Sequence, residues 1–119
     1  MIAAARAVLA INAAYDLLCG AALLGAGPPI FRAPHTFLLW THPVLPTHAI
    51  GAFVLSQAIP RALAAAWPRQ FLFAAVASYL AEAAVVLACA FLTKAILGHS
   101  AAFIVLSCAA LAAALLVLP

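Results

Sequence analysis

Four long apolar stretches dominate the sequence and restrict what the chain can fold into. They cover approximately residues 7–26, 47–66, 71–93 and 100–118. An α-helix rises about 1.5 Å per residue, so roughly 20 apolar residues are needed to cross the hydrocarbon core of a bilayer, which is about 30 Å thick. Each stretch meets this requirement. The sequence therefore predicts an all-α integral membrane protein with four transmembrane helices.

The segments between the stretches indicate how the helices are arranged. Proline and glycine, which interrupt helical patterns, are frequent in these connections. The second and third connections are short, so consecutive helices must pack antiparallel. No internal repeat, low-complexity tail or second domain is visible. We expect residues 1–119 to form a single four-helix bundle.

The charge content excludes several classes of protein. Only 6% of the residues are charged and 71% are hydrophobic, whereas a soluble domain has about 25% charged residues. So few charges cannot cover the surface of a water-soluble globule. The five basic residues are scattered singly and form no stripe that would bind phosphates. An ordinary soluble enzyme, a disordered chain and a nucleic-acid binder are therefore excluded, and membrane lipids are the expected surroundings.

The basic residues that flank the stretches predict an orientation. Arg6, Arg61 and Arg69 fall on the side of the two termini, and Arg32 and Lys94 fall on the other side. Lysine and arginine are enriched in cytoplasmic loops of membrane proteins. The excess of three over two predicts that both termini lie on the cytoplasmic or equivalent side.

Acidic residues near the middle of two stretches are the sharpest anomaly. Asp16 is central in the first stretch and Glu82 in the third. A charge at the bilayer centre costs at least about 2.5–3.5 kcal/mol, so such residues face the bundle interior, are paired or are protonated. Asn12, Gln57 and Ser78 precede Asp16, Arg61 and Glu82, respectively, by four residues, which places each pair on one helix face. The predicted intramembrane polar site comprises Asn12, Asp16, Gln57, Arg61, Ser78 and Glu82.

Three interpretations of these polar residues are open at this point. They form an interhelical network that fixes the packing, a functional site for a lipid headgroup, sterol hydroxyl, cation or proton, or a contact with a partner subunit. The depth of Arg61 permits pairing with Asp16, with Glu82 or with headgroups. No catalytic residue is assigned.

Histidines and tyrosines supply candidate contacts for a ligand or pigment. His35, His42 and His48 fall on one membrane side, where imidazoles are able to ligate a metal, haem or chlorophyll. Their spacing matches no zinc or haem motif, so we expect them to hydrogen-bond to water or headgroups, and we predict no metal site. Tyr15 and Tyr79 each lie close to an acid in the sequence and are able to donate a hydroxyl hydrogen bond. No cofactor is certain; a lipid, sterol or pigment is the candidate.

The order of several of these residues resembles a known family. The residues concerned are Asn12, Gly51, Arg61, Ser78, Tyr79 and Glu82. This order, over residues 48–82 together with Asn12, resembles the Erg28 family of small four-helix membrane proteins that tether sterol-synthesis enzymes. The aromatic-rich Arg-Thr-Phe-Gly-Thr-Trp pattern of the family is replaced here by Thr-His-Ala-Ile-Gly-Ala, and its His-Phe before the acidic residue is absent. The resemblance implies a non-enzymatic scaffold.

Two functions of different classes follow from the sequence. The first is a non-catalytic scaffold or accessory subunit that packs against larger membrane proteins or another copy of itself and binds lipid or pigment. The alternative is an intramembrane carrier or lipid-modifying enzyme that uses the carboxylates of Asp16 and Glu82 as a proton or cation site.

Overall fold

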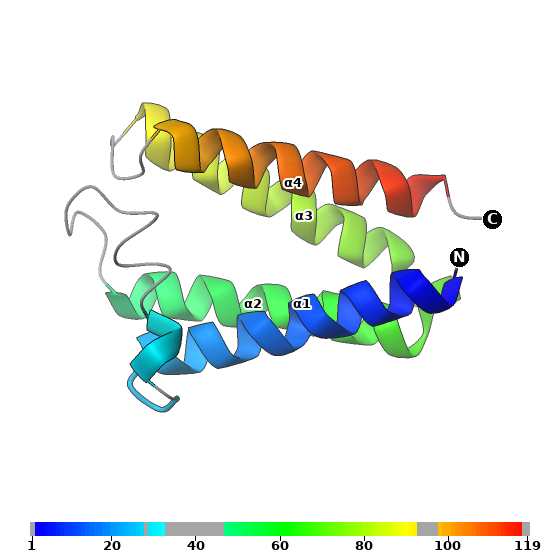
Figure 1. Ribbon diagram of the computed structural model, residues 1–119, viewed down its shortest axis with the longest axis horizontal. Coiled ribbons are helices and arrows are strands. Elements are labelled where there is room, and N and C mark those ends of the chain that lie inside the picture. Colours follow the sequence, from blue (N-terminus) through cyan, green and yellow to red (C-terminus); the bar gives the residue numbers. More distant parts are fainter. Residues whose placement is uncertain (1, 28, 33–46, 93–97, 118–119) are drawn as a thin grey trace.

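The structure, a computed structural model, is all-α over the part of the chain that it describes, which is residues 2–27, 29–32, 47–92 and 98–117. Its helices are α1 (Ile2–Leu23), α2 (Thr47–Ala66), α3 (Pro68–Phe91) and α4 (Gly98–Leu116), with a short 3-10 helix, η1 (Pro29–Arg32), after α1 (Figure 1). No strand occurs in these ranges. The predicted fold class of four helices is confirmed.

Each of the four α-helices is long and apolar enough to cross a membrane. Their bounds differ from the predicted ones mainly in the first helix, which covers Ile2–Leu23 instead of residues 7–26. Gly25 has a φ of 86°, and the N–H groups of Ala26 and Gly27 donate to the carbonyl of Ala21 at 2.8 and 3.1 Å. Glycine adopts this left-handed conformation without a steric penalty, so it ends the helix earlier than the apolar pattern does.

Trp67 alone separates α2 from α3. Pro68 then occupies the first position of α3, where its missing N–H would have no intrahelical partner and its fixed φ suits a helix. This tight connection reverses the chain direction. Consecutive helices are antiparallel, and the start of α1 and the end of α4 lie at the end of the molecule where α2 connects to α3 (Figure 1).

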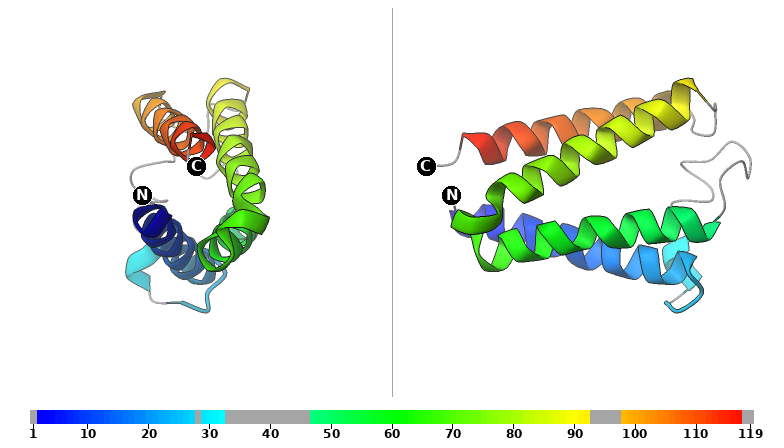
Figure 2. Two further views of the ribbon diagram at one scale, coloured as in Figure 1. Left: turned by 90° about the vertical axis from the view of Figure 1, so that its right-hand side faces the viewer. Right: turned by 180° about the vertical axis from the view of Figure 1, so that it is seen from behind.

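The four helices form two hairpins, α1–α2 and α3–α4, rather than one uniformly closed bundle. The principal helix contacts are α1 with α2, α3 with α4, and α2 with α3. The hairpins meet near the connection of α2 to α3 and diverge toward the opposite end (Figure 2). The core shared by all four helices comprises Leu9, Ala64, Ala75, Val76, Tyr79, Cys108, Ala112 and Leu115. A second, smaller cluster of Val86, Cys89 and Ala101 belongs to α3 and α4 only.

A glycine pair brings α1 and α2 into close contact. A Cβ built on Gly20 would lie 2.9 Å from the backbone nitrogen of Leu55 and 3.0 Å from the carbonyl oxygen of Gly51. A Cβ on Gly51 would lie 2.9 Å from Cβ of Leu23 and 3.1 Å from the carbonyl oxygen of Gly20. Small residues let helix backbones approach in this way. This close contact fixes the position of α1 against α2, so that side chains further along both helices face the interior of the protein.

Candidate functional site

Arg61 is the centre of a buried group of polar side chains from three helices. Its side chain extends from α2, and the residue is only 1% exposed. Nη1 donates to Oδ2 of Asp16 on α1 at 2.6 Å, and Nη2 donates to Oε2 of Glu82 on α3. Nε donates to Oγ of Ser78 on α3 at 3.0 Å. Asp16, Arg61, Ser78 and Glu82 are called the polar cluster below.

Tyr79 completes the surroundings of the guanidinium from a different direction. The carbon at the centre of the guanidinium lies 4.0 Å from the centroid of the Tyr79 ring. A cation over an aromatic face is attracted by the ring quadrupole. The hydroxyl of Tyr79 is buried and has no hydrogen-bond partner within the described ranges. Tyr79 therefore contributes its ring to the cluster, and the expected hydroxyl bond to an acid is not present.

The arrangement follows from helix geometry and from the length of the arginine side chain. Ser78 and Glu82 are four residues apart, so both project from one face of α3. Asp16 lies on α1, which α2 contacts through Gly20 and Gly51. Arg61 thus stands between the two acids and binds both at once. The sequence left its partner open among Asp16, Glu82 and headgroups.

The cluster satisfies the electrostatic requirements of buried charge only in part. Charge-assisted hydrogen bonds at close range offset the desolvation of the three ionisable groups. Two carboxylates nevertheless face one guanidinium, so the cluster carries a net negative charge when both acids are ionised. The side chain of Glu82 is 27% exposed, compared with 12% for Asp16. Glu82 is therefore the more accessible of the two acids.

The thiol of Cys108 brings α4 close to this group, because it lies beside the carboxylate of Glu82. Cys108 is 4% exposed and belongs to the four-helix core. Nothing in the local spacing of α4 could have placed it beside Glu82, because that contact depends on how α3 and α4 are rotated against each other.

Two residues of the predicted polar site do not join the cluster. Nδ2 of Asn12 donates to the carbonyl of Val8 in its own helix at 3.0 Å, a bond that satisfies an amide within one turn. Gln57 is buried, and its Nε2 lies 3.4 Å from Oγ of Ser56. Its Oε1 has no partner in the part of the chain that the structure describes. Spacing of four residues placed both on the expected face but did not determine their partners.

The candidate ligand contacts outside the cluster are not gathered into one site. Tyr15 is 45% exposed, and its hydroxyl lies beside the thiol of Cys19. His48 is exposed in the first turn of α2. His35 and His42 lie outside the described residues. Within the described residues, no three side chains of His, Cys, Asp or Glu are grouped as a metal ion requires.

No model of a protein family, no curated protein and no solved structure matches the chain. The resemblance to the Erg28 family therefore stays a prediction. The residues that suggested it have definite places in the fold. Arg61, Ser78, Tyr79 and Glu82 come together at the cluster, and Gly51 lies at the contact of α1 with α2.

Proposed function

We propose that the chain is a non-catalytic multi-pass membrane protein that serves as a scaffold or accessory subunit beside larger membrane proteins. The observation that carries this proposal is the use of both acidic residues of the chain by one arginine. The polar groups that an intramembrane enzyme would use are engaged in joining α1, α2 and α3. The outer faces of the helices are largely apolar and open to lateral contact.

Large apolar side chains on the outside of the helices support the membrane part of the proposal. The most exposed of them on the four α-helices are Ile11, Phe73, Phe91, Phe103 and Leu106, with exposed fractions of 68–76%. In water such a surface would cause association, because soluble monomers rarely expose large apolar patches. In a bilayer the same side chains contact acyl chains, and the backbone polar groups are satisfied within the helices.

The polar cluster fits a structural role in such a bundle. Side-chain hydrogen bonds between membrane helices contribute on average only about 0.6 kcal/mol, so they determine register more than stability. Arg61 has donors directed at three side chains on two neighbouring helices, which leaves one favourable rotation for each helix. A scaffold needs such a fixed shape, because its outer faces must present the same contacts to every partner.

The scaffold proposal is tested on the intact chain isolated from its native membrane in a mild detergent. We expect native mass spectrometry to find one or more larger membrane proteins in fixed stoichiometry with the chain. Asp16→Asn and Glu82→Gln are expected to lower partner retention only to the extent that they lower thermal stability. Recovery of the chain alone, together with a bound small molecule that either variant loses at unchanged stability, would contradict the proposal.

The accessibility of Glu82 favours one alternative function, an intramembrane carrier or lipid-modifying enzyme. A partly exposed carboxylate in a cluster of net negative charge is suited to taking up a proton or a cation. The alternative predicts proton or cation flux into liposomes that contain the purified chain. Glu82→Gln would then abolish the flux, and Asn12→Ala, outside the cluster, would leave it unchanged. Absence of flux in the unmodified chain argues for the scaffold.

A further inference from the structure

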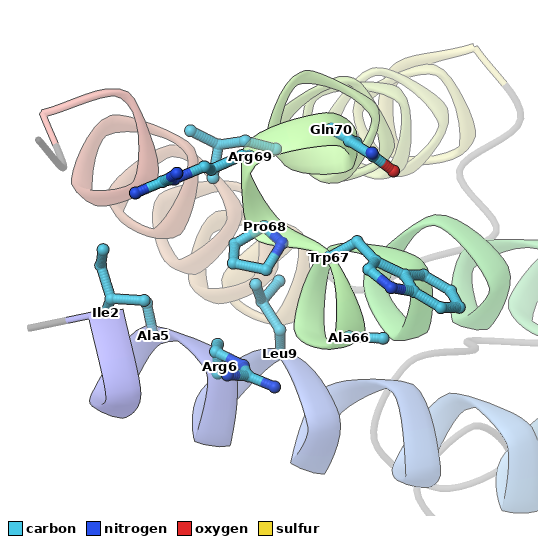
Figure 3. Close-up of a pocket in the computed structure, with 10 residues that line it drawn as sticks. Ile2, Ala5, Arg6, Leu9, Ala66, Trp67, Pro68, Arg69 and Gln70 are labelled. Carbon is cyan, nitrogen blue, oxygen red and sulfur yellow. The ribbon is translucent and has the colours of Figure 1, made fainter.

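A pocket of about 500 Å³ lies at the end of the molecule where Trp67 connects α2 to α3 (Figure 3). Its walls come from the start of α1, the end of α2 and the start of α3. In Figure 3 the α1 residues form one side, and Arg69 extends from the start of α3 above Ile2 and Ala5. The residues that matter for its chemistry are Ile2, Arg6, Leu9, Trp67, Arg69 and Gln70. This hollow is called the interfacial pocket below.

The interfacial pocket carries two positive charges that no acidic side chain balances. Nε of Arg6 donates to the carbonyl of Ala65 at 2.7 Å, which fixes the guanidinium at the pocket wall. Among the described residues, no ion pair involves Arg6 or Arg69. The chain has only two acidic residues, and both are bound by Arg61. The pocket therefore attracts an anion.

Backbone groups at this end add to the attraction. Both α1 and α3 begin at the pocket. The first N–H groups of a helix have no intrahelical acceptor, but in α3 Pro68 has no N–H, and the N–H groups of Gln70 and Phe71 donate to the carbonyl of Trp67, so the donors of this kind belong mainly to α1. These donors favour a bound anion. The carbonyl of Ala65, at the end of α2, already accepts from Arg6. An anion in the pocket thus meets two arginine side chains close to the first N–H groups of α1.

An apolar groove adjoins the interfacial pocket. This hollow of about 300 Å³ lies between α1 and α4, and it shares Ala5 and Leu9 with the interfacial pocket. Its other lining residues include Val8, Leu111 and Leu115, and it reaches Tyr79. The groove exists because α1 packs mainly on α2 and α4 mainly on α3. It is called the α1–α4 groove below.

We propose that the interfacial pocket and the α1–α4 groove together bind one anionic phospholipid. The phosphate lies with Arg6 and Arg69, and an acyl chain follows the groove past Leu9. Both hollows have the size of small-molecule sites, which is roughly 300–1,000 Å³. Trp67 suits the depth of lipid headgroups, and basic pockets between membrane helices bind anionic headgroups. The inference rests on the membrane location in the proposed function.

The occupant is identified by the combination of the two hollows. Free phosphate would use the arginines but leave the groove empty. A zwitterionic lipid would fill the groove but bring a cationic headgroup against two arginines. Only a lipid with a net negative headgroup matches both the positive charge of the interfacial pocket and the apolar lining of the α1–α4 groove.

The experiment uses the purified full chain in a mild non-ionic detergent, where membrane insertion cannot influence the result. Phosphatidylglycerol, phosphatidylcholine with the same acyl chains, and inorganic phosphate are titrated separately, and bound species are counted by native mass spectrometry. We expect one retained phosphatidylglycerol, bound at least about fivefold more tightly than phosphatidylcholine. Inorganic phosphate is not expected to displace it at equal concentration.

Variants test the contributions of the interfacial pocket and of the α1–α4 groove to lipid binding separately. Arg6→Gln and Arg69→Gln are each expected to weaken phosphatidylglycerol binding about fivefold, and together roughly 25-fold. Arg32→Gln removes the same charge at the other end and is expected to change nothing. Ala5→Phe fills the junction of the two hollows and is expected to weaken both lipids, whereas Ala3→Phe, which lines neither hollow, is the matched control. Circular dichroism verifies that each variant remains helical.

Three results would overturn the proposal. Equal binding of both lipids would show that the charge of the headgroup does not influence binding. If Arg32→Gln weakened binding as much as Arg6→Gln or Arg69→Gln, diffuse surface electrostatics would be indicated. Displacement of the lipid by inorganic phosphate at equal concentration would indicate an ion site without a lipid groove. These failures leave the membrane location untouched, because that location fails only if the chain does not insert into bilayers.

Discussion

At the scale of single residues, Arg61 supplies the positive charge that compensates the two carboxylates in the interior of the protein. The carboxylates of Asp16 and Glu82 both accept hydrogen bonds from its guanidinium. Removal of one partner from a buried ion pair leaves uncompensated charge, which typically costs about 3–5 kcal/mol. Replacement of all partners by neutral groups of similar shape is far less costly.

We therefore expect Arg61→Gln to lower the free energy of unfolding by about 3 kcal/mol. The triple variant Arg61→Gln, Asp16→Asn, Glu82→Gln is expected to regain stability to within about 1 kcal/mol of the unmodified chain. Unfolding in mixed micelles with increasing dodecyl sulfate, followed by circular dichroism, measures both values. A triple variant as unstable as Arg61→Gln would contradict the compensation of charge within the cluster.

Tyr79 offers a second test, because its ring and its hydroxyl have different surroundings. The ring faces Arg61 at 4.0 Å, while the buried hydroxyl has no partner within the described ranges. Tyr79→Phe keeps the ring and removes an unsatisfied polar group, so stability is expected to stay equal or rise by up to about 1 kcal/mol. Tyr79→Leu removes the cation–π contact and is expected to cost about 1–2 kcal/mol. A loss above about 1 kcal/mol in Tyr79→Phe would show that the hydroxyl has a partner.

The members of the polar cluster were predictable because charge in an apolar helix is conspicuous. Asp16 and Glu82 stood out by depth, and Ser78 by its spacing from Glu82. Asn12 was selected by the same spacing, but it bonds within its own helix. The contact of Cys108 with Glu82 depends on the relative rotation of two helices, and no spacing along one helix contains that information.

At the scale of the helices, the approach of α1 to α2 depends on Gly20 and Gly51. A Cβ on Gly20 would meet backbone atoms of α2 at 2.9–3.0 Å, so the two helices would have to separate. Gly20→Ala is expected to lower the free energy of unfolding by about 1–3 kcal/mol, as overpacking does. Gly51→Val is expected to cost at least as much.

Gly98 is the matched control for these two variants, because a Cβ there would meet nothing within 4 Å. Gly98→Ala is expected to leave the unfolding free energy within about 0.5 kcal/mol of the unmodified value, since unstrained surface changes usually do. The same micelle titration compares all three variants. An equal loss in Gly98→Ala would indicate that backbone freedom, not the contact of the helices, determines the effect.

The helices themselves were predictable from the lengths of the apolar stretches, but the end of the first was not. The hydropathy pattern extended to residue 26, and the helix ends at Leu23 because Gly25 adopts a left-handed conformation. Hydropathy reports burial in lipid, whereas backbone conformation decides where helical hydrogen bonds stop. The start of α3 at Pro68 follows the ordinary preference for proline in the first turn.

At the scale of the whole molecule, the division into two diverging hairpins could not be predicted from the sequence. A helix that is apolar on all sides has no stripe that marks its packing face. The exposed side chains on α4, which include Phe103 and Leu106, are as apolar as the buried ones. The fold is therefore determined by close contacts such as that of Gly20 with Gly51 and by the polar cluster. Neither feature changes the hydropathy pattern of the sequence much.

The position of Arg61 also changes the argument about orientation in the membrane. The sequence counted Arg6, Arg61 and Arg69 against Arg32 and Lys94, but Arg61 is buried between two carboxylates. An interior arginine with acidic partners does not act as a flanking charge of the kind that sets topology. Two basic residues then remain on each side of the membrane. The cytoplasmic location of the termini stays a prediction, and no excess of positive charge on that side supports it.

A balance of two against two makes the orientation sensitive to single charges at the ends and insensitive to Arg61. In a bacterial host, a fluorescent protein at the C-terminus reports cytoplasmic chains, and alkaline phosphatase at the same site reports exported ones. Arg6→Gln with Arg69→Gln is expected to raise the phosphatase share, and Arg32→Gln with Lys94→Gln to lower it. The triple variant Arg61→Gln, Asp16→Asn, Glu82→Gln is expected to leave the ratio of the two reporters unchanged, because it removes no flanking charge. If that variant shifted the ratio as far as the loss of Arg6 and Arg69, Arg61 would act at the membrane surface during insertion, and its pairing with the two acids would have to form only afterwards.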